Sequence, residues 1–309
     1  MEPAPISPLD SEALARVRRL HLRARTLTDS LLMGEHRSRR VGQAVEFADY
    51  REYAPGMDLR ALDWRVLART DRLVVKRFET ETELPSTVVL DLSADMSTGH
   101  AGRGKLPDLE GSKAGFAITL AATLLTFLHR HGEPVGLELV GGDVIGGVRS
   151  FPSRGGRSHL QRLTAVLATA RPSGVARLED ALLEVGRRSK RRSLVVVLTD
   201  GMEEPSAWLP SLGAIARRGS DLRLGLLYDP RELGLSVDHP ALFYSPEGGA
   251  TLDVDPVAAR KVFDEVVLEH SEEVRAGVVR WGGRFTRLSS ADPLENALRS
   301  LIIAGGGVR

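Results

Sequence analysis

The sequence predicts an α/β fold: a doubly wound, mostly parallel sheet with one antiparallel strand at its edge. From residue 85 onward, short apolar runs typical of buried strands alternate with long helical patterns. A helix and a turn-rich, β-rich stretch precede this region. We therefore expect three parts, an N-terminal amphipathic helix at 1–33, a β-rich appendage at 34–84 and an α/β domain at 85–309.

The first part of the chain carries the helix and the appendage. Apolar residues recur at helical spacing between arginines from Ser11 to Leu32, and we expect Gly34 to end this helix. In the appendage, Tyr53 to Gly56 contains the proline and glycine of a type II turn. The elements expected after that turn are a helix from Trp64 to Arg69, capped by Asp63, and a strand from Leu73 to Phe78.

The α/β domain begins with the apolar strand Thr87–Asp91, and a long helix follows from Ser112 to His131. Pro134–Val140 and Val144–Phe151, separated by two glycines and an aspartate, indicate a hairpin that places an antiparallel strand at the sheet edge. The later elements are expected in the order helix, helix, strand, strand, helix, strand, helix, at 157–170, 178–188, 194–198, 222–227, 256–281, 284–288 and 293–303.

The composition excludes several classes of protein. The 309 residues carry a formal net charge of +1 and no cysteine, which excludes disulfides, thiolate metal sites and thiol nucleophiles. The start, Met1 to Pro5, lacks the basic and apolar pattern of a secretory signal. The most apolar stretch, Ala114–Leu128, is shorter than the roughly 20 residues that cross a bilayer. We expect a cytoplasmic protein without a membrane segment.

Two predicted strands end in carboxylates. Asp91, with Ser93 and Asp95 close behind, follows one strand, and Asp200 follows another. Open α/β sheets place their ligand sites at the carboxyl ends of their strands, so these oxygens converge if the two strands are neighbours. Such hard donors suit Mg²⁺, Mn²⁺ or Ca²⁺. The residues alone leave it equally open that the aspartates only cap loops and helix N-termini.

This pattern resembles the metal-ion-dependent adhesion site of von Willebrand factor A domains, which implies a von Willebrand factor A-like fold. Asp91, Ser93 and Asp200 match, whereas Asp95 replaces the second serine and Ala176 replaces the threonine. In the family's site, neutral hydroxyls leave the metal short of negative charge, so a partner's carboxylate completes the coordination. Asp95 would supply that charge internally. The resemblance implies a degenerate site, with Mg²⁺ or Mn²⁺ bound weakly or not at all because Ala176 lacks a hydroxyl.

A second pattern lies upstream, and its signature residues are Arg51, Tyr53, Gly56, Asp58, Arg60, Asp63, Trp64 and Arg69. It resembles the bacterial family called domain of unknown function 58, in its short soluble branch without a transmembrane hairpin. The similarity runs from about Gly34 almost to the C-terminus and includes Asp229-Pro230-Arg231-Glu232. We expect the charged signature residues to pair and lock the appendage to the sheet, with direct partner contact as the alternative. Trp64 is expected to be buried.

The resemblance implies a non-enzymatic adaptor, because family members are often encoded beside MoxR-type AAA+ ATPases. Such a protein would work with the ATPase in assembly or maturation of a client. We expect the ATPase to contact the carboxyl-end face of the sheet near Asp91, Asp95 and Asp200, through basic or amide groups. The alternative surface is the appendage around Arg51 and Arg60.

Three other functions match the sequence less well. A phosphotransferase or phosphatase of the haloacid dehalogenase type would use Asp91 as nucleophile, but Ser93 replaces the carboxylate that serves as acid and base. Gly99–Leu106 nearly matches a phosphate-binding loop, but Leu106 replaces the hydroxyl residue that holds Mg²⁺. The basic run Arg187–Arg192 and the arginines of the first helix lack interleaved aromatics, so we do not expect nucleic-acid binding.

Overall fold

The computed structural model describes residues 11–39, 49–53, 64–77, 84–99, 109, 111–142, 148–233, 239, 241–243, 245, 247–248 and 251–302. The chain divides into two compact units. The larger unit comprises Met1–Leu31 together with Leu84–Arg309, and the smaller unit comprises Leu32–Glu83. Residues 11–31 of the first helix therefore cluster with the α/β domain.

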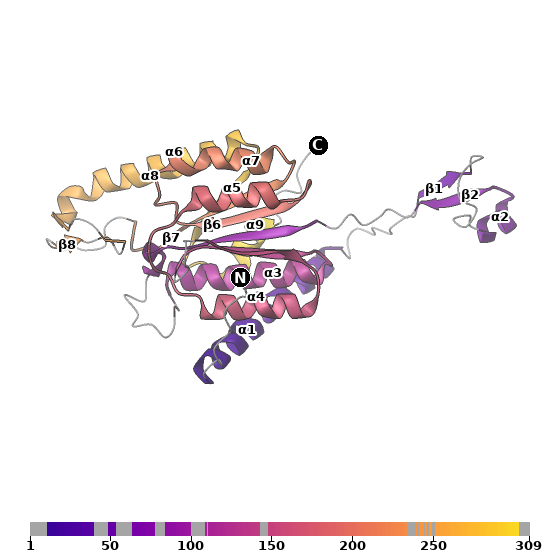
Figure 1. The fold of residues 1–309 in the computed structure, drawn as a ribbon, viewed down its shortest axis with the longest axis horizontal. Helices are drawn as coiled ribbons and strands as arrows, with labels where there is room; N and C mark the ends of the chain where they lie inside the picture. The colour runs from indigo at the N-terminus through magenta and orange to yellow at the C-terminus, as the bar shows by residue number, and fades with distance from the viewer. Residues whose placement is uncertain are drawn as a thin grey trace, which may run out of the picture. The chain divides into compact units, whose positions relative to one another are not determined.

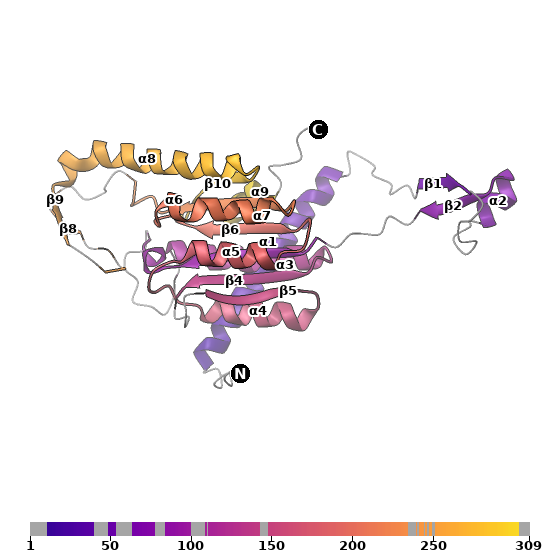
Figure 2. The ribbon, with the colours of Figure 1, turned by 45° about the horizontal axis from the view of Figure 1, so that its top comes forward.

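The larger unit is built on one six-stranded sheet (Figures 1 and 2). Its spatial order is β10-β7-β6-β3-β4-β5, and every neighbouring pair is parallel except β4 and β5. The strands are β3 (Ser86–Leu92), β4 (Val135–Gly141), β5 (Val148–Arg154), β6 (Leu194–Thr199), β7 (Asp221–Tyr228) and β10 (Arg284–Ser289). The predicted fold class is confirmed, and so is the antiparallel strand at the sheet edge.

Helices cover both faces of this sheet, as Figures 1 and 2 show. One face carries α3 (Lys113–Arg130), α4 (Arg157–Thr169) and α9 (Leu294–Ile302), which pack on one another. The other face carries α5 (Leu178–Arg188), α6 (Pro205–Trp208), the 3₁₀ turn η3 (Leu209–Ser211), α7 (Leu212–Ala216) and α8 (Pro256–Arg280). Because β4 and β6 are buried along their whole length, both faces of the central sheet contribute to the core.

The first helix, α1 (Ser11–Arg39), is longer than predicted. Gly34 lies inside it, so the expectation that this glycine ends the helix was wrong. A glycine costs a helix only about 1 kcal/mol, and good helix formers flank it on both sides. Within the larger unit, Asp29 pairs with Arg130 of α3 and the Ser30 hydroxyl donates a 2.8 Å hydrogen bond to Glu295 of α9.

Two short strands that the sequence did not predict precede α8. β8 (Ala241–Phe243) pairs antiparallel with β9 (Leu252–Val254), and Figure 2 shows them at the start of α8. One leucine on each strand is exposed, Leu242 at 65% and Leu252 at 63%.

The smaller unit holds β1 (Asp49–Glu52), α2 (Trp64–Thr70) and β2 (Val74–Arg77). The two strands pair antiparallel, and the Tyr53 N–H continues the ladder with a 2.8 Å hydrogen bond to the Leu73 carbonyl. Trp64 was expected to be buried, which is wrong, because its side chain is 64% exposed. It opens the seven-residue α2, and the described helix and two four-residue strands of this unit do not enclose the indole.

Four of the eight signature residues of the appendage, Gly56, Asp58, Arg60 and Asp63, lie outside the described residues. The side chain of Arg51 and all of the predicted type II turn except Tyr53 lie outside them as well. Arg69 is described and exposed in the last turn of α2. The expected pairing of these charges therefore stays a prediction.

Candidate interaction site at the carboxyl edge of the sheet

The predicted site residues come together at one edge of the sheet. β3 and β6 are adjacent parallel strands, with Leu90 paired to Leu198, so Asp91 and Asp200 emerge side by side. Asp95 follows in the 3₁₀ turn η2 (Ala94–Ser97). Burial, followed by the charge of Asp200, raises the pKa of both other aspartates.

Asp91 is fully engaged inside the protein. It is 1% exposed, and its Oδ1 accepts a 2.8 Å hydrogen bond from the Ser93 N–H. Its Oδ2 accepts a 2.6 Å hydrogen bond from the Thr199 hydroxyl. Burial and then the neighbouring Asp200 charge raise the pKa of Asp91 to about 7, although these hydrogen bonds oppose the shift. Both oxygens of this carboxyl thus already have donors.

A buried lysine that we did not predict lies among these carboxylates. Lys113 Nζ is 2.8 Å from Asp200 Oδ2 and 2.6 Å from Glu232 Oε1, and the lysine side chain is 1% exposed. Burial lowers the pKa of Lys113, but the charges and hydrogen bonds of Asp200 and Glu232 outweigh it, so the pKa is raised overall. Lys113 is therefore a cation inside the protein.

The surrounding backbone fixes the position of Lys113. It is the first residue of α3, after the N-cap Ser112, whose hydroxyl accepts a 3.0 Å hydrogen bond from the Gly115 N–H. The Lys113 N–H donates a 2.9 Å hydrogen bond to the Thr98 carbonyl, which ties the start of the helix to the loop after η2. The side chain thus starts from an anchored turn.

The loop after β7 supplies the second carboxylate of this arrangement. Glu232 Oε1 also accepts a 2.8 Å hydrogen bond from the Thr98 hydroxyl, and Oε2 accepts one of 2.9 Å from the Asp229 N–H. Asp229 is fully buried and accepts hydrogen bonds from the Arg231 N–H and the Ser290 hydroxyl. Three neighbouring strands, β3, β6 and β7, thereby contribute to one site.

Two further carboxylates border the site. Burial, followed by the charges of Asp95, Asp200 and Glu203, raises the pKa of Glu247 to about 7, while a hydrogen bond with the Ala176 backbone opposes this. Glu203 accepts a 2.9 Å hydrogen bond from the Leu178 N–H, and burial raises its pKa as well. These contacts hold the loop before α5 against the site. The edge is consequently rich in carboxyl groups.

The residues present are a poor fit for a divalent cation. The Asp91 oxygens accept hydrogen bonds, and the Asp200 carboxylate is bound to the Lys113 ammonium. Ala176, at the expected threonine position, offers no side-chain oxygen and packs into the core. In the part of the chain that the structure describes, no cluster of three or more His, Cys, Asp or Glu residues could hold a metal ion.

The sequence of this chain matches one protein family and several related proteins. A family described as "Protein of unknown function DUF58" matches residues 49–273, more than half of the chain. The chain belongs to the DUF58 family. Uncharacterized proteins of Mycobacterium bovis and Mycobacterium tuberculosis are each 30% identical to it over 271 residues, covering 86% of this chain and 81% of theirs.

Solved structures resemble this DUF58 chain more distantly. The BatB protein of Bacteroides thetaiotaomicron gives a TM-score of 0.47 at 16% identity, covering 72% of this chain and 98% of its own. The SpRpn10 VWA domain gives 0.41 at 12% identity, covering 74% and 99%.

Sequence reasoning missed Lys113, Glu247 and the direct role of Glu232 in the site of this DUF58 protein. One signal was available for Lys113. The positive end of a helix dipole disfavours a lysine in the first turn, and the rest of this turn and the two that follow are uncharged. A cation in that position needs a partner. Glu247 carried no comparable signal, because it lies outside every element that the sequence predicts.

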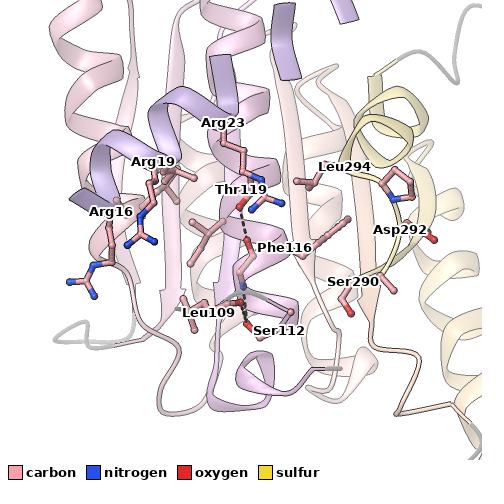
Figure 3. A pocket seen from close by; sticks show the side chains of 18 of the residues that line it. Arg16, Arg19, Arg23, Leu109, Ser112, Phe116, Thr119, Ser290, Asp292 and Leu294 are labelled. Atoms are coloured by element: carbon pink, nitrogen blue, oxygen red, sulfur yellow. Dashed lines mark hydrogen bonds between the residues drawn. The ribbon is translucent and has the colours of Figure 1, made fainter. Parts of the chain in front are cut away.

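A separate hollow of about 530 Å³ lies on the other side of the α3 N-terminus. Figure 3 shows Arg16, Arg19 and Arg23 of α1 beside Phe116 and Thr119 of α3. Ser112 lines this hollow, whereas the next residue, Lys113, reaches Asp200. The start of α3 thus separates a basic hollow from the acidic edge. Over the residues described, no helix combines the length and apolar character needed to span a membrane.

Proposed function

We propose that this DUF58 protein is a non-enzymatic adaptor that binds a MoxR-type AAA+ ATPase during assembly or maturation of a client. One observation supports the carboxyl edge of the sheet as the binding surface. Four acidic residues lie close together there: Asp95, Asp200, Glu203 and Glu247. Loops held by a rigid sheet are well suited to partner recognition. The ATPase itself is inferred from the family resemblance. The cytoplasmic location expected from the sequence stays a prediction.

Uncovered apolar side chains next to this edge support a docking role. Val257, Val262 and Val266 of α8 are 61%, 62% and 56% exposed, and Leu242 and Leu252 lie on the adjacent short strands. Figure 2 shows β8 and β9 at the start of this helix. Exposed apolar residues bordered by charge are typical of protein interfaces. Because the edge is acidic, we expect the partner to present arginine or lysine side chains to it.

Co-purification with the ATPase encoded nearby tests this proposal. We would compare wild type with Asp95→Asn combined with Glu247→Gln, which removes charge from the edge while keeping the shape of both side chains. A charge-matched control, Glu272→Gln combined with Glu273→Gln, changes two exposed carboxylates further along α8. We expect at least tenfold weaker binding in the edge variant and wild-type binding in the control.

Two further variant pairs locate the surface. Asp91→Ala with Asp200→Ala disrupts the site itself, and Arg51→Ala with Arg60→Ala changes the appendage. Loss of binding in the arginine pair alone would move the interface to the appendage. No binding by correctly folded wild type would contradict the adaptor role.

The phosphatase alternative has one observation against it. A nucleophilic carboxylate must reach its substrate, but Asp91 is 1% exposed and both of its oxygens accept hydrogen bonds. Release of nitrophenol from p-nitrophenyl phosphate by wild type, abolished in Asp91→Asn, would favour that alternative.

A further inference from the structure

The carboxyl edge concentrates acidic side chains that need a compensating positive charge. Asp91 and Asp200 are 1% and 2% exposed, and the Glu232 side chain is 29% exposed. Buried carboxylates are costly unless a cation or several donors balance them. Carboxylate oxygens are also the ligands that Mg²⁺ and Ca²⁺ use in proteins.

Lys113 meets this requirement from within the chain. Its ammonium contacts one carboxylate from the β6 loop and one from the β7 loop, at 2.8 and 2.6 Å. A metal ion in such a site would likewise connect oxygen atoms from separate loops. An ammonium has three hydrogen atoms, so both contacts can be full hydrogen bonds.

Without its carboxylate partners, a lysine at this position would destabilise the folded protein. Its charge is fully buried and lies at the positive end of the α3 dipole, so only strong pairing can hold it there. Both partner carboxylates are themselves oriented, Asp200 by the Met202 N–H and Glu232 by the Thr98 hydroxyl and the Asp229 N–H. The arrangement is therefore a preformed receptor for one cation.

We propose that Lys113 is the cation of this site, with its ammonium taking the place of a divalent metal ion between the Asp200 and Glu232 carboxylates. The edge then keeps its structure without metal. This assignment does not depend on which partner the protein binds. It goes beyond the expectation of a weak Mg²⁺ or Mn²⁺ site, since it names the group that replaces the ion.

The test is metal-dependent thermal stability of the full chain. We would measure Tm in EDTA and in millimolar Mg²⁺, Mn²⁺ or Ca²⁺ for wild type, for Lys113→Met and for the control Lys261→Met. The control removes an exposed lysine whose partner is Glu265. Wild type and the control should have the same Tm in EDTA and in each metal. Lys113→Met should unfold about 10 °C lower in EDTA, because two carboxylates lose their cation.

The decisive result concerns metal added to Lys113→Met. With the ammonium gone, Asp200 and Glu232 should accept an ion, so Mn²⁺ or Mg²⁺ should raise the Tm of this variant by several degrees. A variant that stays insensitive to all three metals would contradict the assignment, as would Lys113→Met with wild-type stability in EDTA. A wild-type Tm that rises with metal, and no longer does so in Asp200→Asn, would overturn it as well.

Lys113→Met could fail to fold. Lys113→Met combined with Asp200→Asn and Glu232→Gln removes the buried charges together and should recover a folded state with no response to metal. If the Tm of that triple variant still rises with Mn²⁺, the metal response of Lys113→Met does not come from Asp200 and Glu232, and the proposal fails.

Discussion

The Thr199 hydroxyl donates a 2.6 Å hydrogen bond to Asp91 Oδ2 and so joins the ends of β3 and β6. Thr199 Oγ1 also accepts a 2.9 Å hydrogen bond from the Gly201 N–H. The Ser93 N–H holds the other oxygen of Asp91. This chain of bonds ties together the two loops that carry Asp95 and Asp200, and it accounts for the fixed geometry of the acidic edge.

Replacing Thr199 should therefore weaken the edge. Thr199→Val keeps the side-chain shape but removes the hydroxyl, which leaves the buried Asp91 carboxyl and the Gly201 N–H each short of a partner. We expect the free energy of unfolding to fall by about 1 to 3 kcal/mol, measured by urea denaturation. The exposed Thr169 provides a matched control, since Thr169→Val should change stability by less than about 0.5 kcal/mol. Equal losses in both variants would count against the bridging role of Thr199.

The N-cap of α3 should matter for the same edge. Ser112→Ala removes the hydrogen bond to the Gly115 N–H just before Lys113. We expect a loss of about 1 kcal/mol in unfolding free energy. Ser112→Thr keeps an acceptor at the same place and should retain most of the stability. If the alanine variant is as stable as the threonine variant, the cap does not anchor this helix.

A buried glutamate far from the edge should make stability depend on pH. Burial is the main cause that raises the pKa of Glu138, whose carboxylate accepts a hydrogen bond from the Ser150 hydroxyl. The folded protein thus holds this proton more tightly than the unfolded chain. Its contribution to stability is present below the ordinary glutamate pKa and is lost as pH rises through the raised value.

Glu138→Gln tests this assignment. The amide is neutral at every pH and can still accept the Ser150 hydrogen bond. Relative to wild type, the variant should gain stability as pH rises above the ordinary glutamate pKa, in unfolding free energies measured across a pH series. The exposed Glu265→Gln should follow the wild-type pH profile. Parallel profiles for Glu138→Gln and wild type would show that burial does not shift this group.

The exposed valines of α8 should serve binding and not folding. Val262→Asp with Val266→Asp should change unfolding free energy by no more than about 1 kcal/mol, because both side chains are already mostly in water. Binding of the proposed ATPase should fall at least tenfold in a pull-down or by surface plasmon resonance. Val279→Asp, at the other end of the same helix and 51% exposed, is the control. Unchanged binding in the double variant would exclude this face of α8.

Local patterns predicted much of the fold. Short apolar runs located β3, β6 and β7, and the glycines after Val140 located the hairpin that ends in the antiparallel edge strand. Since parallel strands end at one edge, the sequence also predicted that Asp91 and Asp200 would converge. These features depend on residues close together in the chain or on a general rule of topology.

The parts that failed depend on tertiary context. The predicted first helix was too short, because Gly34 was interpreted as the end of the helix. Trp64 was assigned to a core, but its side chain is 64% exposed among the described residues. Lys113 could be matched with Glu232 only once the loop after β7 was placed beside α3, a relation that no local pattern encodes.

An anomalous difference map from crystals grown in Mn²⁺ would test the role of Lys113 most directly. We expect no manganese peak among Asp91, Ser93, Asp95 and Asp200, and electron density for the Lys113 ammonium between the Asp200 and Glu232 carboxylates. A manganese peak bound to Asp91, Ser93 and Asp200, with the Lys113 side chain displaced, would show that the site holds a metal ion.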